Sequence, residues 1–200
     1  MKPRAMWKVN EIFCSLQGEG YNTGTASVFV RFSGCNLKCN FCDTCHNAGT
    51  QMSLPAIIAE INKYPKAPLI VLTGGEPSLV VNDELIRGLK STGKKIAIET
   101  NGTRQLPCGI DWVTLSPKFT FAGGDAQPCV LTKCDELKVV YCGQDLAVYD
   151  GIAAKNKFLQ PCFVADERQC KQNIKMCVEA VLAHPDWRLS LQTHRILNIR

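Results

Sequence analysis

The 200-residue sequence lacks a long hydrophobic run. This absence excludes a membrane-spanning helix, which needs roughly 20 consecutive apolar residues. The first 20 residues contain Lys and Arg but no continuous apolar stretch and no small-residue cleavage site, so we expect no secretory signal. The sequence also lacks a dense block of Lys and Arg, although its formal net charge is +5. We therefore expect no direct nucleic-acid binding, no membrane association and a cytoplasmic location.

Internal repeats, low-complexity segments and composition shifts are also missing from the sequence. Two hundred residues lie in the upper part of the single-domain range. A hydrophobic content of 46% with 20% charged residues is typical of a globular protein that has a core. We expect residues 1–200 to form one domain.

Cysteine, in contrast, is abundant, with twelve residues in the chain. Cys35, Cys39 and Cys42 stand in the stretch SGCNLKCNFCDT at the spacing C-x3-C-x2-C, and we call residues 33–44 the cysteine loop. Thiolates are soft ligands that suit zinc, copper(I) and iron–sulfur clusters. Most of the other cysteines are scattered singly, and we expect them to be reduced residues of the core and loops.

Three cysteines are an incomplete ligand set for structural zinc, which takes four protein ligands. Cys45 or His46 could supply a fourth, so a zinc module remains an alternative, although the second C-x2-C pair of a zinc ribbon is missing. A four-iron cluster held by three cysteines instead leaves one iron open for a ligand that is not protein.

The strand pattern predicts a mostly parallel sheet. Residues 27–33 alternate and run directly into the cysteine loop, and residues 68–77 form a short apolar run broken by two glycines, as expected of a strand buried on both faces. Four further strands are predicted at 95–100, 112–117, 135–141 and 157–161.

Three helices are predicted between these strands or after them. The first begins after Ser53 and continues at helical spacing until Pro65, the second spans about 82–91, and the third runs from Arg168 to His184. About six parallel strands with so few helices predict an α/β fold, an open partial (β/α) barrel with reduced helix content. The long interval 118–134 is interpreted as a lid or binding loop.

The stretch TGGEP follows the second parallel strand. Gly74 and Gly75 would allow the backbone to approach a ligand closely, and Glu76 places a carboxylate where an ammonium group could bind. A simple strand-to-helix turn is the alternative interpretation.

These motifs together resemble a known superfamily. The cysteine spacing after the first barrel strand is similar to that of radical S-adenosylmethionine enzymes, whose open iron chelates the amino and carboxylate groups of S-adenosylmethionine. TGGEP resembles the GGE motif that binds the methionine amino group in that superfamily. A wider set of motifs, spread over the whole chain, looks like the 7-carboxy-7-deazaguanine synthase family: LQGEG, CDT, TGGEP, ETNGT, SPK and SLQTHRILNIR.

The resemblance implies a radical S-adenosylmethionine lyase that converts 6-carboxy-5,6,7,8-tetrahydropterin to 7-carboxy-7-deazaguanine with loss of ammonia, a step toward queuosine-type deazapurines. It implies a 4Fe-4S cluster, S-adenosylmethionine used as a cofactor, Mg2+, an external electron donor and a homodimer. Two alternatives remain: a glycyl-radical-activating enzyme with the same cluster, and the non-catalytic zinc module.

The resemblance also assigns roles to individual residues. The cluster ligands match Cys35, Cys39 and Cys42, and the magnesium ligand matches Thr44, which could alternatively cap the next turn. The positions matched to substrate binding are Leu16, Gln17, Gly18, Arg31, Thr73 and the terminal carboxylate of Arg200. The positions matched to cofactor binding are Gly74, Gly75, Glu76, Ser116, Pro117 and Lys118, with Glu99 and Asn101 as expected ribose-side neighbours. Cys45 has no assigned role.

Overall fold

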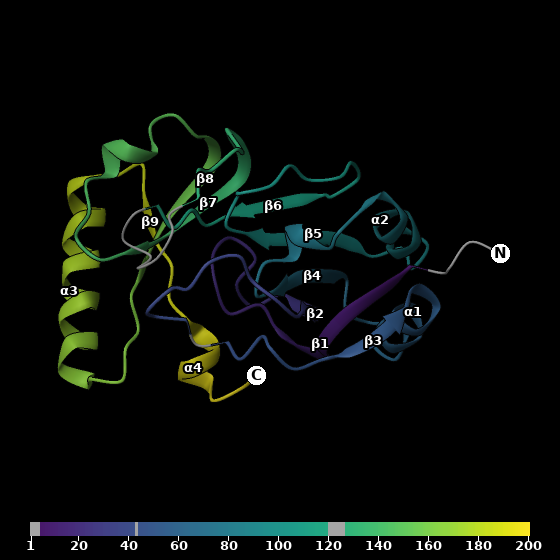
Figure 1. Ribbon diagram of the computed structural model, residues 1–200. Helices are drawn as coiled ribbons and strands as arrows, with labels where there is room; N and C mark the ends of the chain where they lie inside the picture. The colour runs from purple at the N-terminus through teal and green to yellow at the C-terminus, as the bar shows by residue number, and fades with distance from the viewer. Residues whose placement is uncertain (1–4, 43, 120–126) are drawn as a thin grey trace.

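The computed structural model describes residues 5–42, 44–119 and 127–200 (Figure 1). Its strands form one sheet in the order β3-β1-β2-β4-β5-β6-β7-β8-β9. The strands are β1 (Met6–Leu16), β2 (Ala26–Phe32), β3 (Thr50–Ser53), β4 (Leu69–Gly74), β5 (Lys95–Thr100), β6 (Trp112–Leu115), β7 (Lys133–Tyr141), β8 (Ala153–Pro161) and β9 (Arg188–Leu189).

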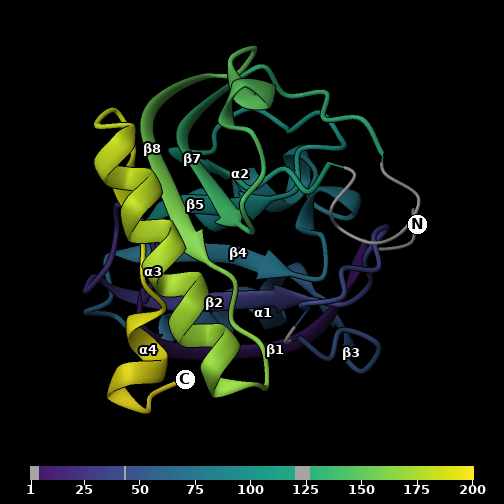
Figure 2. The same ribbon diagram turned by 90° about the vertical axis from the view of Figure 1, so that its left-hand side faces the viewer.

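The sheet is parallel from β2 to β9, and β1 and β3 extend it with antiparallel pairing. All six predicted parallel strands are therefore confirmed. Figure 2 shows these strands following one another in a twisted fan from β2 to β8. The prediction did not include β1 or β3. Both pair in antiparallel fashion and have exposed positions, with β3 at the edge of the sheet and β1 between β3 and β2. Neither carries the buried apolar run of a central parallel strand.

The described helices are few, as predicted. They are α1 (Leu54–Asn62), α2 (Asp83–Lys90), α3 (Glu167–Ala183) and α4 (Thr193–Leu197), with short 3-10 helices η1 (Pro77–Leu79) and η3 (Leu146–Tyr149). Side chains cap two of the α-helices: Asn82 accepts a hydrogen bond from the Leu85 amide of α2, and Asp166 accepts from two amides of α3. The first helix ends at Asn62, before Tyr64, which the sequence pattern had placed within it.

Two of the three apolar clusters lie on the outer face of the curved sheet. The first fills the space between the strands β2, β4 and β5 and the helices α1 and α2, and it includes Phe32, Ile57, Leu72, Leu85 and Ile98. The second lies between β6 to β9 and α3, and it includes Leu115, Leu137, Tyr149, Cys177 and Trp187. Figure 1 shows α1 and α2 at one end of the sheet and α3 at the other. The inner face carries a third, smaller apolar cluster, which includes Phe13 and Phe29, beside the polar residues of the cavity.

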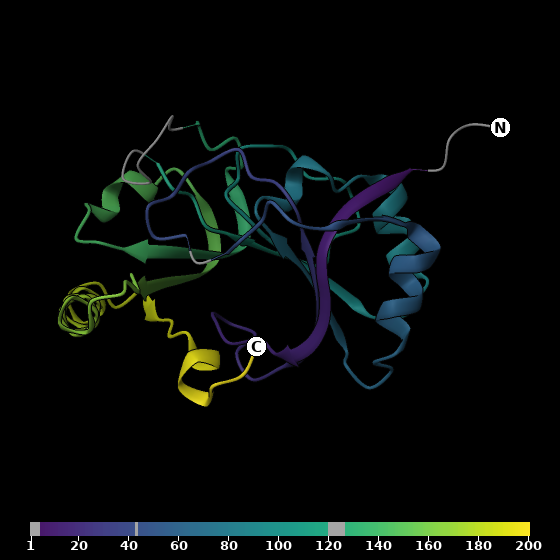
Figure 3. The same ribbon diagram turned by 60° about the horizontal axis from the view of Figure 1, so that its bottom comes forward.

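The C-terminal segment returns to the start of the chain. Thr193 donates two hydrogen bonds, from its amide and its hydroxyl, to the carbonyl of Gly18, each at 2.9 Å. Figure 3 shows α4 and the C-terminus beside the turn that joins β1 to β2. Segments that are far apart in sequence thus close one side of the barrel.

Two predicted features fall partly outside the described residues: Asp43 of the CDT motif, and residues 120–126 of the interval expected to be a lid or binding loop. Within the described part of the chain, no helix has the length and apolar character needed to cross a membrane.

Candidate active site

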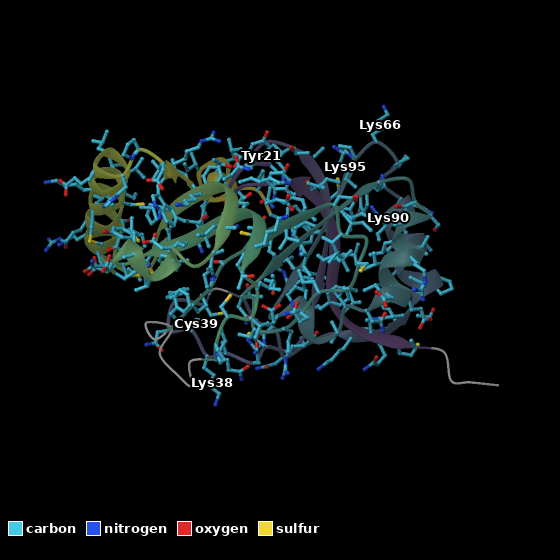
Figure 4. The ribbon with its side chains drawn as sticks, turned by 90° about the horizontal axis from the view of Figure 1, so that it is seen from above. Tyr21, Lys38, Cys39, Lys66, Lys90 and Lys95 are labelled. Atoms are coloured by element: carbon cyan, nitrogen blue, oxygen red, sulfur yellow. The ribbon has the colours of Figure 1, made fainter. Side chains whose placement is uncertain are left out.

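A cavity of about 310 Å³ lies within the barrel. Figure 4 places Lys38 and Cys39 of the cysteine loop at one side of the molecule, with Lys66 and Lys95, which precede or begin parallel strands, at the opposite side. The cysteine loop therefore lies at the carboxyl ends of the strands, where open α/β sheets bind ligands. All residues that the sequence assigned to the site line this cavity except Pro117, which is buried between two lining neighbours.

The three cysteines of the C-x3-C-x2-C motif are free thiols that line the cavity together. Burial raises the pKa of the Cys35 thiol, with further contributions from Glu76 and Cys42. Burial also raises the pKa of Cys39, and the Lys118 ammonium opposes this shift. Cluster binding requires thiolates and would favour their deprotonation. Three soft donors on one loop that line one cavity fit a three-cysteine iron–sulfur cluster.

The described residues give the zinc alternative no support. In the ranges 5–42, 44–119 and 127–200, no three His, Cys, Asp or Glu side chains converge on a position that could hold a single metal ion. Cys45 and His46, the candidates for a fourth zinc ligand, do not line the cavity with the other three cysteines. Cysteines that each bind a different iron of a cluster need not meet at one point, whereas the four ligands of tetrahedral zinc must do so.

Gly74 and Gly75 hold the cysteine loop against the end of β4. Gly74 has a φ of +140°, and a Cβ there would lie 2.2 Å from the carbonyl oxygen of Phe32. A Cβ on Gly75 would lie 2.1 Å from the carbonyl oxygen of Gly34. The structure thus gives these glycines a reason that the sequence did not: the close approach is made by protein backbone.

Glu76 is buried, and its carboxylate accepts three hydrogen bonds from protein donors. These come from the Ser78 amide at 2.9 Å, the Thr100 hydroxyl at 2.6 Å and the Asn101 amide at 2.7 Å. Through them Glu76 joins the end of β4 to the end of β5. The carboxylate still lines the cavity, so it can both order this edge and face a ligand.

Arg31 points into the cavity from β2, as alternation along that strand predicted. Its Nε donates to Glu11 Oε1 at 2.8 Å, and its NH1 lies 3.4 Å from the hydroxyl of Thr44. Glu11 also forms an ion pair with the guanidinium of Arg200, which lies 4.6 Å from the centre of the Phe13 ring. Glu11 therefore holds both arginines at one wall of the cavity.

Glu99 is surrounded by residues that were assigned to the substrate. Its Oε1 accepts from Gln17 Nε2 at 3.0 Å and from Lys138 Nζ at 3.2 Å, and its Oε2 accepts from the Thr73 hydroxyl at 3.4 Å. The sequence interpretation had placed Glu99 on the ribose side of the cofactor. Its observed neighbours associate it more closely with the substrate segment.

Lys118 and Asn101 lie near the cysteine loop. Lys118 donates to the Ser116 hydroxyl at 2.6 Å, and burial lowers the pKa of its ammonium group while Cys39 opposes that shift. Asn101 Nδ2 donates to Asn36 Oδ1 at 3.0 Å, linking the end of β5 to the loop. The strand ends and the cysteine loop are therefore fixed to one another by side-chain hydrogen bonds.

The sequence interpretation missed several polar residues that line the cavity: Glu19, Lys138, Gln160, Gln192 and His194. A signal was present for Lys138, since a lysine inside the apolar strand DELKVVY is rarely buried without a partner. Glu19 stands within the quoted motif LQGEG. Gln192 and His194 stand within the quoted motif SLQTHRILNIR, whereas nothing local indicated Gln160.

Comparison with known proteins agrees with this geometry. Residues 29–118 match the Radical SAM superfamily. The chain is 56% identical to a 7-carboxy-7-deazaguanine synthase of Bacteroides thetaiotaomicron, over 98% of this chain and 100% of the relative. It is 41% identical to one of Bradyrhizobium diazoefficiens, over 97% and 99%. Among solved structures, QueE from Escherichia coli has a TM-score of 0.73 at 28% identity and 94% coverage of both chains. The three-cysteine cavity and these full-length similarities show that the chain belongs to the 7-carboxy-7-deazaguanine synthase family of radical S-adenosylmethionine enzymes.

Proposed function

We propose that this protein converts 6-carboxy-5,6,7,8-tetrahydropterin to 7-carboxy-7-deazaguanine with loss of ammonia, in queuosine-type deazapurine biosynthesis. The observation that carries the proposal is the composition of one cavity. The three cysteines of the radical motif and the polar residues Gln17, Arg31 and Glu99 line the same cavity. The family name rests on full-length relatives, so we do not pursue the glycyl-radical-activating alternative.

The cofactors of the family fit this chain's own residues. Cys35, Cys39 and Cys42 would hold a 4Fe-4S cluster, and the strand ends at Gly75, Ser116 and Lys118 would face S-adenosylmethionine. When bound, the cluster and S-adenosylmethionine supply the radical that starts the reaction. The barrel contributes the relative positions of the groups that line the cavity.

The substrate end of the cavity offers groups suited to a carboxylated pterin. The Arg31 guanidinium is a bidentate donor that matches the geometry of a carboxylate. Gln17, Thr73 and Glu99 form a hydrogen-bonded row that can present an amide, a hydroxyl and a carboxylate to the donors and acceptors of the pterin ring. Leu16 and Gly18 belong to the same segment. Arg200 lies at the adjoining wall, where its backbone oxygen accepts from the Ser15 hydroxyl.

Thr44 is the proposed protein ligand of Mg2+. The Thr44 hydroxyl lies beside Arg31 at 3.4 Å. A cation there would lie close to the expected position of the substrate carboxylate. Magnesium prefers octahedral oxygen coordination, so the substrate carboxylate and waters would complete its shell.

The proposal extends to the partners of the reaction. An external one-electron donor must reduce the cluster, and we propose a homodimer in the cytoplasm as the working form. Size-exclusion chromatography with light scattering tests the dimer independently of activity.

Anaerobic turnover tests the main proposal. The protein is reconstituted with iron and sulfide and mixed with 6-carboxytetrahydropterin, S-adenosylmethionine, magnesium and a strong reductant, and the products are identified by mass spectrometry. We expect 7-carboxy-7-deazaguanine, with S-adenosylmethionine not consumed in proportion to product. A protein that carries about four irons and sulfides per chain and yields no 7-carboxy-7-deazaguanine would contradict the proposal.

A further inference from the structure

Lys138 is a buried cation that faces the cavity from β7. Along this strand Lys138 and Val140 line the cavity, whereas Leu137 and Val139 pack into the core that α3 covers. The side chain of Lys138 is only 7% exposed. A lysine so deeply buried needs anionic partners, because moving an ammonium group out of water is unfavourable without them.

Two carboxylates from different parts of the chain supply that compensation. Lys138 Nζ donates to Glu19 Oε2 at 2.6 Å and to Glu99 Oε1 at 3.2 Å. Glu19 Oε1 accepts in turn from Gln192 Nε2 at 2.7 Å. One ammonium group therefore connects the segment after β1, the end of β5 and the C-terminal tail.

The charges of Lys138 and its carboxylate partners stabilise one another. Burial alone would raise the pKa of Glu19, but Lys138 outweighs burial and lowers the pKa to about 2. Burial alone would lower the pKa of Lys138, whereas Glu19, Glu99 and Glu136 together raise it above its ordinary value. Glu19 is therefore a carboxylate and Lys138 an ammonium group at neutral pH.

Glu99 keeps acceptor capacity that faces the cavity. An ionised carboxylate offers about four acceptor positions on its two oxygens. Oε1 is used by Gln17 and Lys138, while the described residues provide Oε2 with a single donor, the Thr73 hydroxyl at 3.4 Å. The side chain of Glu99 is 24% exposed. Lys138 thus holds one oxygen in place and leaves the other available.

We infer that Lys138 is a positioning residue of the pterin site, which orients Glu99 to accept hydrogen bonds from the adjacent N–H groups of the pterin pyrimidine ring and, through Glu19 and Gln192, closes the C-terminal tail over the same site. The inference rests on the proposed function, because it names the pterin as the ligand. It adds a residue that touches neither the cluster loop nor the expected carboxylate site at Arg31.

A purely structural ion pair would make a different prediction, so the test must separate folding from ligand positioning. Lys138→Met removes the charge and keeps most of the side-chain volume. The double variant Glu19→Gln with Lys138→Met also removes the buried carboxylate that would otherwise lose its partner. Lys138→Arg retains a cation. The matched control is Lys155→Met, which makes the same chemical change on β8, where the side chain is 68% exposed and pairs with Asp135.

Each reconstituted enzyme is assayed anaerobically for kcat and for KM toward the carboxytetrahydropterin substrate, with S-adenosylmethionine affinity and thermal unfolding measured alongside. Binding of 6-carboxypterin, a fluorescent oxidised pterin, gives a readout that does not depend on turnover. For Lys138→Met we expect at least a tenfold loss of pterin affinity and a S-adenosylmethionine affinity within twofold of wild type. Lys138→Arg should recover part of the loss, and Lys155→Met should match wild type.

The double variant is decisive if Lys138→Met folds poorly. We expect it to regain thermal stability and to retain the tenfold loss of pterin affinity. Recovery of pterin affinity together with stability would overturn the inference, as would wild-type affinity in a folded Lys138→Met enzyme. A wild-type enzyme that carries its cluster but neither binds nor converts the pterin would instead overturn the proposed function, and with it the ligand named here.

Discussion

The two halves of the sheet are built differently, although they share one cavity. In the half from β1 to β5, the helices α1 and α2 cover a continuous apolar cluster. In the half from β6 to β9, α3 covers a second cluster, and the described segments that link β5, β6 and β7 contain no α-helix. The cysteine loop follows β2 in the first half, while Lys138 and the C-terminal tail belong to the second.

The two halves of the partial barrel therefore make different contributions to the cavity. The first half presents the radical motif on regular β/α units whose strand ends are fixed by Gly74, Gly75 and Glu76. The second half replaces missing helices with polar contacts that cross the cavity, such as the bond from Lys138 to Glu99. We therefore expect substitutions in the cysteine loop to affect the cluster, and those at Lys138 and the C-terminal tail to affect substrate affinity. The following predictions are ordered by decreasing size of effect.

The largest effect is expected at the cysteine loop of the first half. Cys35→Ala should abolish turnover, because the cluster loses one of its three thiolates. The fold should persist, since the loop lies outside both apolar clusters. Iron content, the absorbance of the reconstituted protein and its thermal unfolding check this prediction. Cys45→Ala is the matched control, because Cys45 does not line the cavity; equal loss of iron in both variants would contradict the assignment.

Core truncations compare the stability of the two halves directly. Ile98 in the first cluster and Leu137 in the second are both fully buried. Replacing either by Ala should lower the free energy of unfolding by about 3 kcal/mol, through lost burial and a residual cavity. Because one hydrogen-bonded sheet joins the halves, we expect a single unfolding transition for both variants in denaturant titrations.

Leu182→Ala on α3 is the control for these truncations, since its side chain is 78% exposed, and it should change stability by less than about 0.5 kcal/mol. Two separate transitions in either core variant would show that the halves unfold independently and would break the comparison.

A smaller effect is expected at Glu11, which joins Arg31 to Arg200 at the wall of the first half. Glu11→Gln removes the charge that orients both guanidinium groups. We expect KM toward the pterin substrate to rise three- to tenfold, equivalent to about 1 kcal/mol, with kcat little changed. Glu60→Gln, which removes a surface ion pair with Lys63, is the control. An unchanged KM would show that Arg31 does not need Glu11 for its position.

The smallest expected change in stability concerns two ion pairs, one from each half of the sheet. Burial would raise the pKa of Asp111, but Lys90 and the Ile96 amide outweigh it and lower the pKa below its usual value. The stabilisation is therefore present at neutral pH and is lost as the pH falls through the lowered pKa of Asp111, below about pH 4. Asp111→Asn should cost about 0.5 kcal/mol at pH 7, because solvent screens a partly exposed pair.

Denaturant titrations of wild type and Asp111→Asn at pH 7 and pH 3 measure this difference, which should shrink at the lower pH. Asp186, whose pKa Lys157 lowers in the second half, is more exposed. Asp186→Asn should therefore change stability less than Asp111→Asn. A larger effect for Asp186→Asn would contradict the expected role of burial.

Local sequence alone was enough to predict the parallel strands, the helices α1 to α3 and the radical motif. Periodicity and capping residues are local signals, and the spacing of Cys35, Cys39 and Cys42 lies within eight residues. Because these signals are local, they do not predict strands that depend on pairing with distant parts of the chain. Strand β1 depends on pairing with β2 and β3, which no short stretch of sequence specifies.

The surroundings of the cavity, in contrast, depend on tertiary structure. Glu99, Lys138 and Gln192 come from β5, β7 and the tail, and their hydrogen bonds cross 39 residues or more of sequence. Gly75 was expected to admit a ligand, yet the atom nearest to its missing side chain is the carbonyl oxygen of Gly34. Residue types and spacing specify which chemistry a chain can carry. The long-range contacts that fix the positions and protonation states of these side chains form only when the sheet has closed around the cavity.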